Sequence, residues 1–178
     1  AMVLSKLADA IPGKVKFVRA DHYFNLYNQA HKLPFNLVLS PKTSLKSGRS
    51  SASPDLATDG TPATLWTSSD AGEQWIEFDL GGICRINRYV IRHAGANGMS
   101  RDLNTRSFMV QARVDDGSWA TIDAIKGNTG NVTDVELDPV NARVVRIAVT
   151  DAGADATARI AEVEFFGGPF WRPAAQER

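Results

Sequence analysis

The sequence predicts a mainly β protein, an antiparallel β-sandwich, with a short N-terminal α/β appendage. Two patterns indicate this fold. After about residue 70, short runs of alternating apolar and polar residues are separated by Gly, Asp and Asn, which is typical of antiparallel strands joined by tight turns. Before about residue 40 the order is instead helix, strand and helix. The chain has 178 residues, enough for one well-buried domain and an appendage.

The predicted appendage covers residues 1–39. Apolar residues at 3–11 share one helical face, 14–18 has the pattern of a short strand, and Asp21 is placed to cap a second helix. Because a segment of about forty residues cannot bury enough apolar surface to fold alone, it either packs on the β-domain or is the end of an upstream domain. The opening Ala1-Met2 resembles a cloning remnant and favours an upstream domain.

The predicted strands follow in close succession, and no helix is predicted between them. The run at 106–114 alternates most regularly, with Phe108, Val110, Ala112 and Val114 expected to face the core. The acidic pair before Gly117 is expected to form a hairpin turn. The runs that predict strands are 73–80, 84–92, 106–114, 118–125, 131–138, 142–150 and 158–166.

Composition excludes several classes of function. The 20 basic residues balance 20 acidic ones without a Lys/Arg run, so no nucleic acid or anionic membrane is expected as a partner. No apolar run is long enough to cross a bilayer. The single cysteine, Cys84, excludes an internal disulfide or a cysteine-based zinc cluster and is expected to be a small core residue.

Catalytic patterns are missing from the sequence. Two of the 3 histidines fall in the appendage, and the chain has neither a nucleophile elbow nor a zinc-binding helix motif nor a phosphate loop. We therefore predict that this chain is not itself an enzyme.

Several segments resemble the discoidin domain, also called the coagulation-factor type C domain. They are "ATDGTPATLWTSS", "QWIEFDLGG", "FMVQARVDDGSW", "ARVVRIAVT" and "RIAEVEFFG", in family order over roughly 43–168. The resemblance is to the bacterial branch of carbohydrate-binding modules, since the terminal cysteine pair of animal members is missing. It implies a jelly-roll-like β-sandwich at 40–168 with binding loops at one end and a tail at 169–178.

The same resemblance implies a function and a location. Such modules target an attached glycoside-active enzyme to a glycan outside the cell, and residues 1–39 would then be the end of the catalytic domain. The alternative is a structural or protein-docking domain that packs on its parent enzyme without binding sugar.

The segment "DLATDGTPATLW" suggests a calcium site. Asp59 offers a carboxylate, the backbone turns sharply at Gly60 and Pro62, and neighbouring threonines add oxygens of the kind that calcium prefers. In the resembled family this loop often holds a structural calcium with a Glu from the final strand, which Glu162 matches, with Glu164 next. A metal-free turn remains the alternative, and Trp66 and Trp75 are expected to be core aromatics. The candidate ligands are Leu56, Asp59, Thr61, Thr64 and Glu162.

The polar stretch between the second and third predicted strands is the candidate sugar site, because long connections in compact domains are often functional. Galactose-binding members of the family use a His, an Arg and an Asn from comparable loops. No aromatic residue occurs at 93–106, 126–131 or 151–157, so a stacking platform is missing or comes from Trp171 or Phe170. The candidates are His93, Asn97, Arg101, Asn104, Arg106 and Trp171.

A structural interpretation of the same loop stays open. Arg106 could be held by Asp102, and Asn104 with Thr105 could cap the turn into the next strand. The two interpretations differ in whether these side chains face solvent or the protein.

Overall fold

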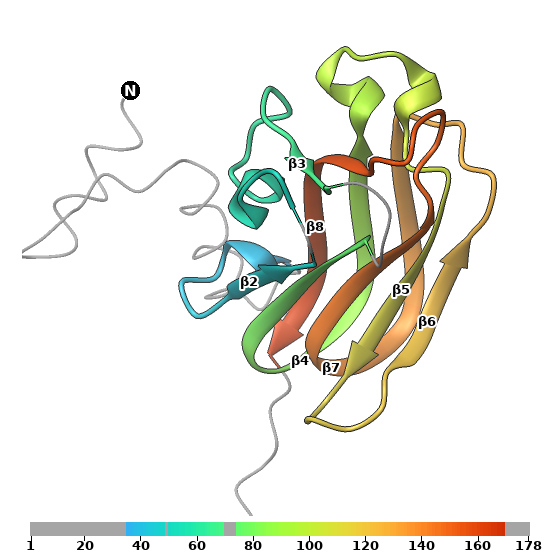
Figure 1. The fold of residues 1–178 in the computed structure, drawn as a ribbon. Coiled ribbons are helices and arrows are strands. Elements are labelled where there is room, and N and C mark those ends of the chain that lie inside the picture. The colour runs from blue at the N-terminus through green and yellow to red at the C-terminus, as the bar shows by residue number, and fades with distance from the viewer. Residues whose placement is uncertain (1–34, 49, 70–73, 170–178) are drawn as a thin grey trace, which may run out of the picture.

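The computed structural model describes residues 35–48, 50–69 and 74–169, which fold into two antiparallel β-sheets packed face to face (Figure 1). Short 3-10 turns lie at η1 (Leu37–Leu39), η2 (Pro54–Ala57), η3 (Ala94–Asn97) and η4 (Arg101–Leu103). The strands are β1 (Phe35–Asn36), β2 (Ser44–Ser47), β3 (Trp66–Thr67), β4 (Gln74–His93), β5 (Ser107–Arg113), β6 (Ala120–Ile125), β7 (Val132–Asp151) and β8 (Arg159–Pro169).

Two long strands, β4 and β7, bend and join the sheets. Their pairing register shifts between Asp79 and Cys84, so that each strand contributes one half to each sheet. The first sheet has the order β2, β4, β7, β5, β6 and uses residues 74–80 and 142–151 of the long strands. The second sheet pairs the other halves with β8, whose outer edge carries β1 and β3.

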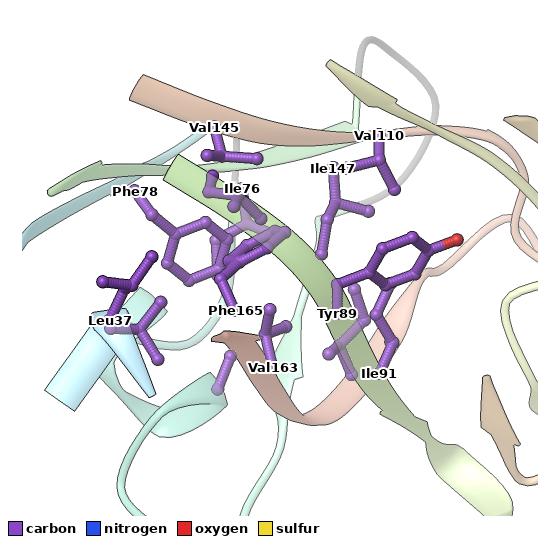
Figure 2. Packing of buried hydrophobic residues seen from close by; sticks show 14 of the residues in the cluster. Leu37, Ile76, Phe78, Tyr89, Ile91, Val110, Val145, Ile147, Val163 and Phe165 are labelled. Atoms are coloured by element: carbon purple, nitrogen blue, oxygen red, sulfur yellow. The ribbon is translucent and has the colours of Figure 1, made fainter. Parts of the chain in front are cut away.

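The core fills the space between the sheets with alternate side chains of each strand (Figure 2). Phe165 lies at its centre, with its ring 5.5 Å from Phe78 and 6.3 Å from Tyr89. The Tyr89 hydroxyl donates a hydrogen bond to the Asp123 carboxylate at 2.5 Å, so this buried polar group has a partner. Burial raises the pKa of Tyr89 far above its usual range, which keeps it neutral.

The strands predicted between residues 73 and 166 form, whereas the strand predicted at 14–18 lies outside the described residues. Two adjacent pairs of them merge into the bent strands β4 and β7, which sequence periodicity cannot show because the phase changes at the bend. Val114 is wrongly predicted as a core residue and is 40% exposed, because β5 ends at Arg113 and Val114 begins the turn. Cys84 is buried, as predicted.

The boundary of the β-domain lies earlier than residue 40. Strand β1 pairs with the end of β8, and Leu37 and Val38 are buried in the core, so 35–39 belong to the sandwich. The rest of the predicted appendage, 1–34, lies outside the described residues. Within the part of the chain that is described, no helix is long and apolar enough to span a bilayer.

Candidate functional site

Several connections meet at one end of the sandwich, where η3 and η4 lie (Figure 1). Main-chain hydrogen bonds tie them together. The Arg106 N–H donates to the Asp151 carbonyl at 2.8 Å, and the Asn128 N–H donates to the Arg106 carbonyl at 2.7 Å. The Ala154 N–H donates to the Asp102 carbonyl at 2.7 Å. The polar connection between β4 and β5 is therefore an ordered surface fastened to its neighbours.

Asn104 holds this surface together and is itself 1% exposed. Its Oδ1 accepts a hydrogen bond from the Gly95 N–H at 2.7 Å. Its Nδ2 donates to the Gly130 carbonyl and to Asn131 Oδ1, both at 3.1 Å. Since every strong bond of this amide is made within the protein, the geometry does not support Asn104 as a sugar ligand and favours its structural interpretation.

His93 is also enclosed, with no exposed surface. Its Nε2 lies 2.9 Å from Thr133 Oγ1, and its ring packs 5.7 Å from that of Phe108. Burial lowers the pKa of His93 from 6.5 to about 4, so the ring is neutral near pH 7. A sugar cannot reach His93 in this arrangement, and the predicted contact is not supported.

Two glycines let these loops approach closely. Gly153 has φ of 108°, and a Cβ there would lie 2.7 Å from the carbonyl oxygens of Asp102 and Asn104. At Gly95 a Cβ would overlap the Asn131 amide. Any side chain at either position would push the loops apart, because the atoms it would meet are packed or belong to the backbone.

The remaining loop candidates reach the surface. Arg101 and Arg106 are exposed, and no ion pair involving either of them occurs among the described residues. Asp102 does not hold Arg106 and instead accepts a weak 3.4 Å hydrogen bond from Ser100. Asn97 is half-buried and donates to the Pro62 carbonyl at 2.7 Å, which joins η3 to the loop around Asp59. Trp171 and Phe170 lie outside the described residues.

A shallow hollow of about 450 Å³ opens beside this surface. It is lined by Gln74, by the end of β7 from Val149 and by the following connection as far as Ala156. Ser107 pairs with Asp151 across the strands, so the hollow adjoins the start of β5, directly after Arg106. The open shape suits a small polar ligand that stays in contact with water.

The predicted calcium residues also come together. Asp59 Oδ2 accepts a hydrogen bond from Thr64 Oγ1 at 2.7 Å, and Asp59 Oδ1 accepts one from the Thr61 N–H at 3.1 Å. Glu162 in β8 lies beside Asp59, although the two residues are far apart in sequence. Leu56 lies in η2, close before Asp59 in the chain.

The chemistry of this pair fits a bound cation. Glu162 is 6% exposed, and its buried Oε1 has no hydrogen-bond partner in the part of the chain that the structure describes. Burial and the neighbouring Asp59 raise the pKa of Glu162 to about 7. Two adjacent carboxyl groups, one with an unfilled oxygen, are stabilised by a cation that satisfies both. No cluster of three or more His, Cys, Asp or Glu side chains occurs in the described ranges, so neutral oxygens would have to complete the coordination.

One predicted core aromatic lies elsewhere. Trp66 is fully buried, but Trp75 is half-buried on the outer face of the first sheet. The alternation of the strand already indicated this position. Trp75 falls on the same side of β4 as Glu77 and Asp79, and the buried Ile76 and Phe78 fall on the other side. Its neighbour on that face is Trp119, a residue that the sequence analysis did not single out.

A family model named F5/8 type C domain matches residues 41–163, which is most of the chain. The chain belongs to this family. The match confirms the discoidin resemblance and, together with the fold, the predicted β-sandwich. No curated protein sequence matches the chain significantly.

Solved structures of the same fold include sugar-binding modules. The family 32 carbohydrate-binding module of Streptococcus pneumoniae EndoD is 24% identical, with a TM-score of 0.63, and the match covers 74% of this chain and 99% of that one. The family 32 module of Clostridium perfringens NanJ, solved with galactose, is 18% identical with a TM-score of 0.64, and coverage is 75% and 99%. Carbohydrate-binding modules are non-catalytic, in agreement with the prediction that this chain is not an enzyme.

A third structure shows the fold within a larger enzyme. It is CpGH89 from Clostridium perfringens, in complex with its substrate GlcNAc-α-1,4-galactose. The chain is 26% identical to it with a TM-score of 0.62, and the match covers 75% of this chain but 15% of that one. In that protein, therefore, a domain like this one is part of a longer polypeptide.

Proposed function

We propose that this domain is a carbohydrate-binding module that recognises a terminal, galactose-like sugar at its loop end. One observation carries the proposal: Arg106 is exposed and has no carboxylate partner among the described residues, on a loop that Asn104 fastens to its neighbours. A free guanidinium on a rigid base can offer two parallel N–H donors to neighbouring hydroxyls without first breaking an ion pair. The family membership supports the same class of ligand.

The roles of the predicted residues are revised accordingly. Arg106 is the principal donor, with Arg101 and Asn97 beside it, and the hollow along 149–156 receives the ring. His93 and Asn104 act as positioning residues beneath this surface. Because these loops contain no aromatic side chain on which a sugar ring could stack, binding is expected to be weak, with a dissociation constant on the order of micromolar to millimolar.

We also propose a structural calcium ion at Asp59 and Glu162. Their carboxylates, with oxygens from Leu56, Thr61 and Thr64, form the candidate coordination set. The ion would neutralise the paired carboxylates and stabilise the loop at 58–65. Since Asn97 bonds to Pro62 in that loop, the calcium loop and the sugar surface share a contact.

An attached glycoside-active enzyme, acting outside the cell, is the proposed setting. The support is the enzyme CpGH89, in which a similar domain is one part of a larger polypeptide. In this setting the module would raise the local concentration of the catalytic domain at its glycan.

The second candidate is a structural domain that binds no sugar. The observation that favours it is the lack of Trp, Tyr and Phe in the connections at 93–106, 126–131 and 151–157. A glycan-array screen distinguishes the two. We expect the wild type to bind glycans that end in galactose or N-acetylgalactosamine, and the double variant Arg101→Ala/Arg106→Ala to lose them while its melting temperature is unchanged. Absence of binding by the wild type would favour the structural domain.

A further inference from the structure

The outer face of the first sheet carries a cluster of aromatic and planar polar side chains. We call it the platform, and it consists of Trp75, Trp119, Gln111, Arg113 and Arg146. Strand pairing places Trp75, Gln111, Arg113 and Arg146 on one face, since Glu77 lies opposite Arg146 and Arg146 lies opposite Gln111. Trp119 lies just before β6 and joins them through its ring contacts with the two arginines. The residues between them, such as Ile76 and Val110, point into the core.

The platform is held in a fixed arrangement. The guanidinium carbon of Arg146 lies 4.2 Å from the centre of the Trp119 ring and 5.9 Å from that of Trp75. The guanidinium carbon of Arg113 lies 4.5 Å from the Trp119 ring. Gln111 Oε1 accepts hydrogen bonds from Nε and Nη2 of Arg146 at 3.1 and 2.9 Å. Both indoles are half-buried, so ordered apolar surface stands at the boundary with water.

The polar groups of the platform are not all satisfied by the protein. Nε of Arg113 is buried without a hydrogen-bond partner, and its ion pair with Glu77 is long, at 3.5 Å. Arg146 has no carboxylate partner among the described residues. Hydrogen-bonding capacity therefore remains on the half-buried guanidinium of Arg146, which lies beside both indoles.

A hollow of about 210 Å³ adjoins the platform. This volume is below the roughly 300 Å³ at which pockets for drug-sized ligands begin, so it can take one small ring at most. Its lining carries both signs of charge, with Lys46, Arg113 and Arg143 against the four carboxylates of Glu77, Asp79, Asp115 and Asp116, so the formal charges cancel to within one negative charge.

These features favour a neutral ligand that is rich in hydroxyl groups. A hydroxyl both donates and accepts, so it can use the mixed cations and anions of the hollow. A polyanion such as nucleic acid or a polyuronate would be repelled by the four carboxylates of the hollow. The indoles in turn suit the apolar face of a sugar ring.

We propose that the platform is a second carbohydrate-binding surface, which takes the interior of a neutral oligosaccharide chain. One ring would lie in the hollow and further rings over Trp119 and Trp75, with hydroxyl groups bonded to Arg113, Arg146 and Glu77. The inference shares with the proposed function only the class of ligand, because it uses none of the loop residues. The loop end would bind chain ends and the platform chain interiors.

Affinity electrophoresis of the full chain tests this directly. The probes are soluble neutral polysaccharides cast into the gel, namely galactan, arabinogalactan, xylan and hydroxyethylcellulose, with polygalacturonate as the charged control. At least one neutral polymer should retard the wild type. Trp119→Ala should weaken that retardation by roughly tenfold or more, the loss expected on truncating an aromatic anchor, while the loop variant Arg106→Ala should retain it.

A measurement on the wild type covers the case in which Trp119→Ala does not fold. The chain has 4 tryptophans, so its indole N–H groups give few and separable NMR signals. Titration with a soluble oligosaccharide of the retarding polymer should shift the Trp75 and Trp119 signals and leave that of the buried Trp66 in place.

The possible outcomes separate the two surfaces. Retardation lost in Trp119→Ala and kept in Arg106→Ala supports the platform, whether or not the loop end binds terminal galactose. The inference is overturned if no neutral polymer retards the wild type, if polygalacturonate retards it more strongly, or if the Trp75 and Trp119 signals do not shift. Loss in Arg106→Ala alone would assign the binding to the loop end.

Discussion

The loop end and the outer face of the first sheet are both rich in polar residues, but they use them differently. At the loop end, His93 and Asn104 are buried and bonded within the protein, whereas Arg101 and Arg106 are exposed. On the sheet face, Arg113 and Arg146 stay half-buried beside indoles. The comparison teaches that the residue type in a polar segment does not distinguish a ligand group from a supporting one. The burial of a side chain and the hydrogen bonds it already makes within the protein distinguish the two.

The largest expected effect comes from breaking the support of the loop end. Asn104→Ala removes three hydrogen bonds and leaves the Gly95 N–H and the Gly130 carbonyl without this partner. Urea unfolding should show that the free energy of unfolding of this variant is about 2–4 kcal/mol lower than that of the wild type. Arg106→Ala, the exposed control in the same loop, should change stability by less than about 0.5 kcal/mol. Equal stability of the two variants would mean that Asn104 does not hold the loops together.

The next effect depends on pH and on His93. Burial lowers the pKa of His93 to about 4 in the folded chain, against 6.5 when unfolded. The unfolded state therefore binds the proton more readily, so the contribution of His93 is fully present above pH 6.5 and is lost as pH falls through 4. Its size is roughly 3 kcal/mol. Urea unfolding at pH 7, 5.5 and 4 should show wild-type stability falling more steeply than that of His93→Gln, and parallel curves would contradict a buried neutral ring.

Calcium removal is expected to have a smaller effect. A ligand that binds only the native state stabilises by mass action, so a chelator should lower the melting temperature by a few degrees, corresponding to about 2 kcal/mol, and added calcium should restore it. Asp59→Ala should melt at the same temperature with and without calcium. An identical wild-type curve in chelator and in calcium would leave Asp59 and Glu162 as a metal-free pair.

The strands could be predicted because their alternation reports directly which face is buried, and Asp59 and Glu162 could be placed together through the family resemblance. The bends in β4 and β7 could not be predicted, because a bend shifts the alternation of apolar and polar residues without requiring a particular residue type. The burial of His93 also escaped prediction. It depends on contacts with Phe108 and Thr133, which only the paired strands bring close.

Calorimetric titration of galactose-type sugars into the wild type and Arg106→Ala tests the central claim most directly. That claim is that an exposed guanidinium on a fixed loop binds the sugar. The wild type should bind galactose or N-acetylgalactosamine with a dissociation constant in the micromolar to millimolar range, and Arg106→Ala should bind about tenfold more weakly, a difference of about 1.4 kcal/mol. Absence of wild-type binding, or equal affinity of a folded Arg106→Ala, would contradict it.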